Sequence, residues 1–140
     1  MFQGGFRPET FWLSCFAADS NIVFDTHHDY FAGRPTTSDN LPTFMCEDAK
    51  DSIGDGKFPV FVGEWSIQAV SNNIFASRAN NLNNGLNAWF KYTQGSSYWT
   101  AKFSGNAPVG GQGTQSDYWD YLTFIDMKAI NARSSAGFCP

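Results

Sequence analysis

The sequence lacks the long apolar run and the basic cluster that two large classes of proteins need. None of its apolar stretches reaches the roughly 18 residues of a membrane-spanning helix. Lysine and arginine together number 9 against 13 acidic residues, and they are scattered singly along the chain. Because no basic patch is present to neutralise phosphates, we expect no nucleic-acid partner and no membrane partner.

Cysteine is also scarce, with only Cys15, Cys46 and Cys139. These residues form no Cys-x-x-Cys pair, so a zinc site is not expected, and we expect no cofactor of any kind. Three thiols allow one disulfide with one free cysteine, or a partner outside the chain. The apolar stretch 11–18 lacks a basic leader, and we do not interpret it as a signal peptide.

Aromatic residues, by contrast, make up 17% of the 140 residues. Large aromatic side chains fill cores, and their flat faces also suit sugar rings. The length suffices for one domain, but it is far below the roughly 250 residues of an eight-stranded α/β barrel.

Three strand-like stretches alternate with segments of helical periodicity. The alternation predicts an α/β fold in which β-α units build a parallel sheet. Three such units leave both apolar edges of the sheet open, which predicts a fragment and self-association through these edges. The expected strands are 21–25, the apolar run that begins at residue 57 and stops at Gly63, and 96–103; the expected helices are 9–18, 40–53, 77–92 and 116–130.

Polar side chains follow the first two of these strands. Residues 25–30 come after one, and Glu64 comes directly after the other. The carboxyl ends of parallel strands are where α/β barrels place catalytic groups. The alternative for Glu64 is a solvated glutamate in a loop, since charged residues are mostly exposed.

Three motifs, in this order along the chain, resemble the fungal exo-β-1,3-glucanase-like branch of glycoside hydrolase family 5. Residues 25–28 (Asp-Thr-His-His) resemble the end of the sixth barrel strand of that family. Residues 62–66 (Val-Gly-Glu-Trp-Ser) resemble its nucleophile segment, and residues 97–102 (Ser-Tyr-Trp-Thr-Ala-Lys) its eighth strand. Residues 2–5 also resemble the loop after the fifth strand, so the likeness covers most of the chain.

This resemblance implies the C-terminal part of a TIM (β/α)8 barrel. Residues 1–140 would then be a partial catalytic domain that carries strands 6 to 8. The complete enzyme would be a secreted, extracellular or cell-wall hydrolase that cleaves β-glucans with retention. That chemistry needs two carboxyl groups, one as nucleophile and one as acid/base.

The resemblance also assigns roles to individual residues. Glu64 matches the nucleophile, and His27 matches the cleft histidine that hydrogen-bonds near the catalytic carboxylates; the alternative for His27 is a histidine that caps the end of a strand. Asp25 is interpreted as structural, either fixing the end of the strand or orienting His27. Trp99 matches the tryptophan under the sugar; its alternative is core packing. Substrate contacts are expected from Tyr30 and His28 as well.

Two positions depart from the family pattern. The acid/base glutamate lies in an Asn-Glu pair, and this sequence contains no such pair. Asp29 stands where the family has a tyrosine, and its negative charge is expected to raise the pKa of a neighbouring carboxyl such as Glu64. The isolated chain is therefore expected to be weakly active or inactive. The alternatives are a non-catalytic carbohydrate-binding module and a truncated product without a function of its own.

Overall fold

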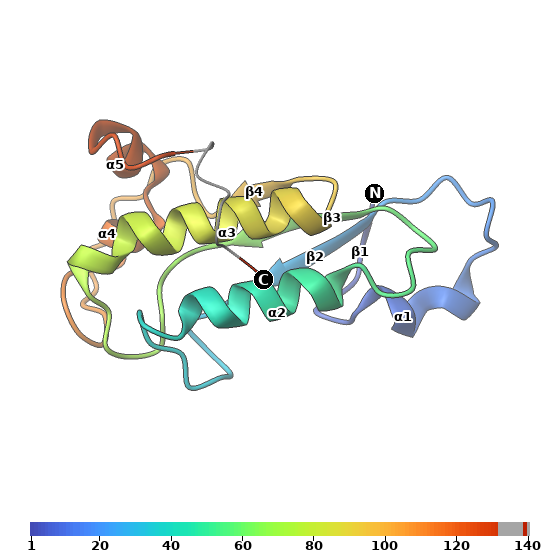
Figure 1. The fold of residues 1–140 in the computed structure, drawn as a ribbon, viewed down its shortest axis with the longest axis horizontal. Helices are drawn as coiled ribbons and strands as arrows, with labels where there is room; N and C mark the ends of the chain where they lie inside the picture. The colour runs from blue at the N-terminus through green and yellow to red at the C-terminus, as the bar shows by residue number, and fades with distance from the viewer. Residues whose placement is uncertain (132–138, 140) are drawn as a thin grey trace.

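Four short strands lie side by side in one parallel sheet, in the order in which they occur along the chain. The computed structural model describes residues 1–131 and 139. The strands are β1 (Phe2–Gln3), β2 (Phe24–His28), β3 (Val60–Trp65) and β4 (Ser96–Tyr98), so β1 and β4 form the two edges (Figure 1). The α/β class and the parallel sheet that the alternation predicts are confirmed.

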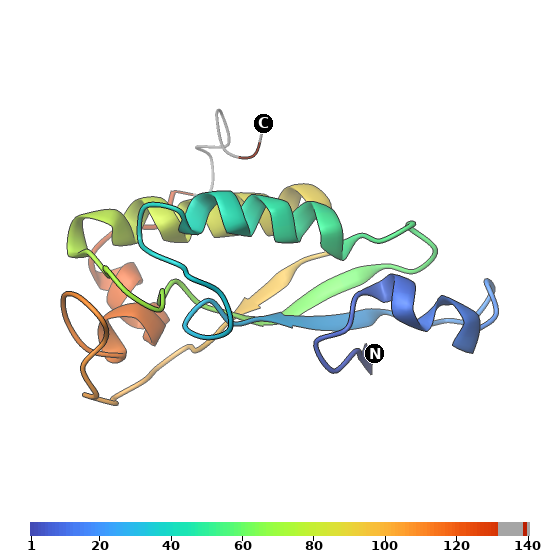
Figure 2. The same cartoon turned by 90° about the horizontal axis from the view of Figure 1, so that it is seen from below.

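Helices cover one face of this sheet. The long helices α2 (Leu41–Ser52) and α3 (Arg78–Tyr92) lie together over it, and among the described residues the opposite face carries no comparable layer (Figure 2). The shorter elements lie towards the ends of the sheet: α1 (Glu9–Trp12), two 3-10 turns (Leu13–Cys15 and Phe75–Ser77), α4 (Ser116–Trp119) and α5 (Tyr121–Asp126).

The two long helices form where their apolar periodicity predicts them. α2 begins after Asn40 with a proline in its first turn, where the missing N–H costs nothing. In α3 the helix-weakening asparagines bond to backbone groups of their surroundings: the Asn81 amide donates to Ser38 O at 2.9 Å and that of Asn84 to Pro42 O at 3.0 Å. These contacts offset their low helix propensity.

Several expected boundaries are wrong. The strand expected at 21–25 lies three residues later, and the one after residue 57 continues through Glu64 to Trp65. The polar residues there are strand residues, because ladder hydrogen bonds to a neighbouring strand satisfy the backbone whatever the side chain. Residues 2–5, which resemble a loop, contain β1, in which Phe2 N–H donates to Val23 O at 2.8 Å.

The remaining corrections concern shorter elements. The strand expected at 96–103 ends at Tyr98, so Trp99 lies beyond it, joined to Thr100 by a cis peptide bond. The helix expected at 9–18 becomes α1 and a 3-10 turn. The helix expected at 116–130 breaks at Asp120, whose backbone is extended. The Asp120 side chain accepts a hydrogen bond from Leu122 N–H at 3.0 Å and so caps the start of α5.

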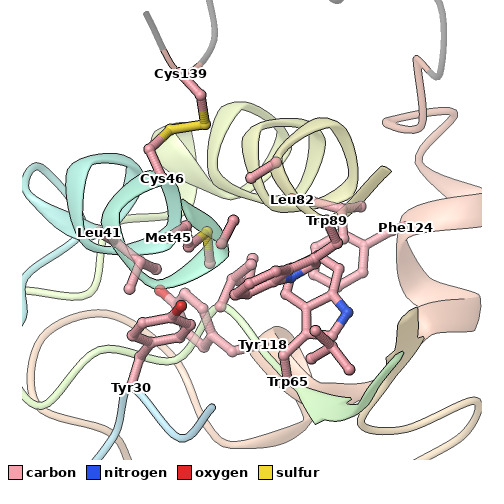
Figure 3. Packing of buried hydrophobic residues seen from close by; sticks show 14 of the residues in the cluster. Tyr30, Leu41, Met45, Cys46, Trp65, Leu82, Trp89, Tyr118, Phe124 and Cys139 are labelled. Carbon is pink, nitrogen blue, oxygen red and sulfur yellow. A yellow bond between two sulfur atoms is a disulfide. The ribbon is translucent and has the colours of Figure 1, made fainter. Parts of the chain in front are cut away.

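The main core lies between the sheet and the two long helices. Trp65 from β3 meets Trp89 from α3 with ring centroids 6.0 Å apart, and Tyr30, Met45 and Phe124 complete the cluster (Figure 3). A disulfide between Cys46 and Cys139 ties the tail to α2, and Cys15 is the free cysteine. Of the two arrangements that the sequence leaves open, the structure has one disulfide and one free cysteine.

A β-bulge at Gly63 decides which way Glu64 points. Thr26 pairs with Val62 while the next residue, His27, pairs with Glu64, so β3 holds one extra residue. Val62 and Trp65 both belong to the helix-side core. In a regular strand, alternation would place residue 64 on the face of Val62; the bulge turns Glu64 to the face without helices.

Candidate active site

Three polar side chains meet on the face of the sheet that the helices leave open. His27 Nδ1 lies 3.7 Å from Glu64 Oε2, and His27 Nε2 lies 3.7 Å from Asp25 Oδ1. The side chains are partly buried, with exposed fractions of 22% for His27, 24% for Glu64 and 16% for Asp25. The pairing of β2 with β3, together with the bulge at Gly63, brings Glu64 and His27 together.

Gly63 makes room for Asp25 beneath this group. A Cβ at residue 63 would lie 2.0 Å from Asp25 Oδ1, closer than any two such atoms can approach. That oxygen is buried and has no hydrogen-bond partner among the described residues. The carboxylate of Asp25 thus lies next to His27 in the space that Gly63 leaves, and its role in orienting the histidine stays a prediction.

The electrostatic surroundings raise the pKa of Glu64 above its ordinary value. Burial contributes most, the negative charge of Asp29 next, and Asp25 adds to it, whereas His27 acts in the opposite direction. The expected effect of Asp29 on Glu64 is confirmed in direction. A partly buried carboxyl beside a histidine is suited to nucleophilic or proton-transfer chemistry.

The Phe6 ring contacts His27, and the backbone of Trp99 bonds to the residue that follows Glu64. The Phe6 ring lies edge-on to His27 with centroids 5.9 Å apart, and it lines a cavity of about 240 Å³ beside β2. Trp99 follows β4. Its backbone N–H donates to the backbone O of Trp65 at 2.8 Å, and Trp65 is the residue after Glu64 in the chain. The side chain of Trp99 is 44% exposed, so the core-packing alternative for Trp99 does not apply.

His28 and Tyr30 are not part of this group. The burial of Tyr30 contradicts its expected contact with substrate, whereas that of His28, which lines the cavity beside β2 together with Asp25 and His27, stays a prediction. His28 alternates with His27 along β2 and faces the helices, where it stacks on Trp89 with centroids 5.0 Å apart. Its Nε2 lies 2.9 Å from Ser52 Oγ. Tyr30 is fully buried in the helix-side core (Figure 3), and desolvation raises the pKa of its hydroxyl.

Asp48 holds a second polar cluster, which sequence reasoning missed because its members stand far apart along the chain. His28 Nδ1 lies 3.6 Å from its Oδ2, and Arg34 donates to both carboxylate oxygens. Burial alone would raise the pKa of Asp48, but the interactions with His28 and Arg34 outweigh it and lower the pKa to about 2. This cluster fixes the loop after β2 against α2.

Within residues 1–131 and 139, no group of three histidine, cysteine or acidic side chains could hold a metal ion. No helix in the same residues is both long and apolar enough to cross a bilayer.

The chain matches solved structures over nearly its whole length. The rutinosidase from Aspergillus niger has 53% sequence identity and a TM-score of 0.91 over 94% of this chain, and AoRut has 57% identity and a TM-score of 0.90 over 93%. The chain is similar to one segment of a larger glycoside hydrolase. It spans only 37% and 36% of the lengths of these two proteins, respectively. Comparisons with protein-family models and with curated proteins give no match.

The similarity supports a glycoside hydrolase in general, which is the class of enzyme that the motifs imply. The matched enzyme is a rutinosidase and not an exo-β-1,3-glucanase. Membership of family 5, action on β-glucan and a closed barrel therefore go beyond what the comparison gives.

Proposed function

We propose that the chain carries the nucleophile half of a retaining β-glycosidase, with Glu64 as the nucleophile. The contact between His27 and Glu64 at 3.7 Å on the open face of the sheet is the observation that carries this proposal. The arrangement would belong to the last strands of a TIM barrel of family 5 type. In such a barrel the carboxyl ends of the strands surround the substrate.

In this proposal the first step of the reaction runs on Glu64. A carboxylate oxygen of Glu64 attacks the anomeric carbon while the bond to the leaving oxygen breaks and takes the electron pair with it. His27 and Asp25 hold the carboxylate in place, and Trp99 offers a flat face to the sugar. Hydrolysis of the resulting glycosyl ester needs a general base, for which the family uses the acid/base glutamate that this sequence lacks.

Two substrate classes are candidates. A rutinoside is favoured by the 53% identity to the Aspergillus niger rutinosidase. A β-glucan is the second candidate, because the motifs at residues 25–28, 62–66 and 97–102 resemble exo-β-1,3-glucanases. Both carry a β-linked glucosyl unit at the reacting carbon, so a simple aryl β-glucoside can test the common chemistry.

Release of phenolate from 2,4-dinitrophenyl β-glucoside tests this function, because that leaving group departs without a general acid. We expect a burst of about one dinitrophenolate per chain, followed by slow turnover because no base activates water. Azide, a nucleophile that needs no base, should raise the slow rate by about tenfold or more and give the β-glucosyl azide. Glu64→Gln should abolish the burst. A burst that persists in Glu64→Gln, or no burst from cooperatively folded protein, would contradict the proposal.

A further inference from the structure

A serine, a histidine and an aspartate lie in a row on the helix side of β2. His28 Nε2 lies 2.9 Å from Ser52 Oγ, and the other ring nitrogen, Nδ1, lies 3.6 Å from Asp48 Oδ2. Asp48 and Ser52 are four residues apart on α2, so their side chains share one face of that helix, whereas His28 ends β2. A histidine that contacts a hydroxyl through one nitrogen and a carboxylate through the other can activate a serine as a nucleophile.

The surroundings of His28 favour this role. The Asp48 carboxyl has its pKa lowered to about 2 and is therefore ionised at neutral pH. An ionised Asp48 favours the proton on Nδ1 of His28, which leaves Nε2 free to accept the proton of the Ser52 hydroxyl. The ring stacks on Trp89 with an interplanar angle of 25°, so it has a fixed orientation. A positively charged imidazole would gain stability from the face of the indole and from Asp48.

A cavity of about 240 Å³ adjoins the row, and Ser52, His28 and Asp48 all line it. Its volume suits a short acyl group and excludes a long chain. Four acidic side chains and two arginines line it, namely Glu9, Asp25, Asp48, Asp51, Arg7 and Arg34. Because negative groups outnumber positive ones in this wall, a neutral ester fits it better than an anionic one.

Arg34 supplies positive charge to the same cavity. It donates to Asp48 Oδ1 through Nη1 at 2.9 Å and to Oδ2 through Nη2, and its side chain is 38% exposed. A guanidinium has five N–H donors, so these two bonds leave others for a ligand. A positive charge held in this way would stabilise the oxyanion that forms when a hydroxyl adds to an ester carbonyl.

We propose that Ser52, His28 and Asp48 form a second reactive site, which hydrolyses short neutral esters. Ser52 Oγ adds to the carbonyl carbon while its proton passes to His28 Nε2. The ester C–O bond then breaks, and the alcohol leaves with that proton, so that an acyl-serine remains. Water, deprotonated by His28, releases the carboxylic acid and restores the serine. Asp48 is a positioning residue that acts through His28.

This activity goes beyond the glycosidase proposed above and does not depend on it. The reacting groups face the helices, whereas Glu64 faces the open side of the sheet. The contacts that build the row join residues 28, 34, 48, 52 and 89, all of which lie well inside the chain.

Hydrolysis of 4-nitrophenyl acetate by the full chain tests this inference. The exposed thiol of Cys15 would also attack this ester, so every protein in the series carries Cys15→Ser. We expect release of nitrophenolate and, after an acid quench, one acetyl group on Ser52, located by peptide mapping. Ser52→Ala and His28→Gln should each lower the rate of release by about 100-fold or more. Ser14→Ala, at an exposed serine, is the matched control and should keep the full rate.

Asp48→Asn tests the positioning role separately. It should lower kcat for the ester about tenfold or more and leave KM unchanged, because Asp48 acts on the proton transfer and not on binding. A change in KM alone would contradict that role. Circular dichroism should show that all of these variants are folded.

An unchanged rate in folded Ser52→Ala would overturn the inference, and so would acetyl groups found only on other residues. The cluster would then serve only to fix the loop after β2. Mapping of the acetyl group needs no variant other than Cys15→Ser, so a variant that fails to fold leaves the test intact. The ester contains no sugar, and its adduct lies on a different residue from Glu64. The two proposals can therefore fail separately.

Discussion

His27 and Glu64 face each other from neighbouring strands, with Nδ1 and Oε2 3.7 Å apart, although the register of a regular sheet would separate them. The extra residue Gly63 in β3 brings Glu64 to the side of His27 and leaves Trp65 in the core. One bulge therefore separates a group with catalytic potential from the packing that supports it. β-bulges serve this purpose in many active sites, because they change the direction of a single side chain.

Gly63→Ala should destabilise the protein by about 2–3 kcal/mol, because the new methyl group would collide with the fixed carboxylate of Asp25. Urea denaturation gives the free energy of unfolding. Gly56→Ala is the control: nothing lies within 4 Å of its added methyl, and only its positive φ of 77° opposes the change. We expect a loss of about 1 kcal/mol there. Equal losses at both positions would show that Asp25 does not occupy the space above Gly63.

Asp29→Asn should lower the pKa of Glu64. The negative charge of Asp29 helps to raise this pKa, so its removal favours the ionised carboxyl. The nucleophile must be ionised, and the burst rate with 2,4-dinitrophenyl β-glucoside therefore rises as pH rises through the pKa of Glu64. We expect this rise to move to lower pH in Asp29→Asn. Asp126→Asn, an exposed change at the end of α5, should leave it in place. A shift to higher pH in Asp29→Asn would contradict the account of the site.

Cys46→Ser should cost roughly 4 kcal/mol of stability. The disulfide to Cys139 closes a loop with a sequence separation of 93 residues, and cross-links of such long loops remove much entropy from the unfolded chain. Urea midpoints measure the effect, and dithiothreitol should reproduce it in the unchanged protein. The free and exposed Cys15 supplies the control, since Cys15→Ser should change stability by less than about 0.5 kcal/mol.

Asp48→Asn should flatten the dependence of stability on acid. The pKa of Asp48 is lowered from 3.8 to about 2 in the folded protein, so its ionised form stabilises the fold above pH 3.8. That contribution, about 2 kcal/mol, is lost as pH falls through about 2. Between pH 4 and pH 2, the free energy of unfolding of the unchanged protein should fall by about 2 kcal/mol more than that of Asp48→Asn. Glu47→Gln, at an exposed position beside it, should behave like the unchanged protein.

The long helices and the gathering of polar residues at the carboxyl ends of β2 and β3 could be predicted from the sequence, whereas the bulge that turns Glu64 towards His27 could not. Apolar residues at helical spacing define α2 and α3, and polar residues after two apolar runs must gather at one edge of a parallel sheet. Such patterns persist along the chain and do not depend on the exact register.

The faces of single residues could not be predicted. His28 and His27 differ only by one position, and the alternation assigns them to faces only once the start of β2 is known. The position of β2 depends on its pairing with β3, which no local pattern reveals. The burial of Tyr30 could not be predicted either. Its ring packs in the core with Leu41 and Met45 of α2, because the loop after β2 folds back under that helix and not towards the open face.

The central claim is that Glu64 is a competent nucleophile, and trapping of a sugar tests it most directly. The chain is incubated with 2-deoxy-2-fluoroglucosyl fluoride, whose leaving group needs no general acid, and its intact mass is then measured. We predict a single covalent adduct of one fluoroglucosyl unit per chain, located on Glu64 by peptide mapping and absent in Glu64→Gln. An unmodified mass for a cooperatively folded sample, or an adduct on any other residue, would contradict the account.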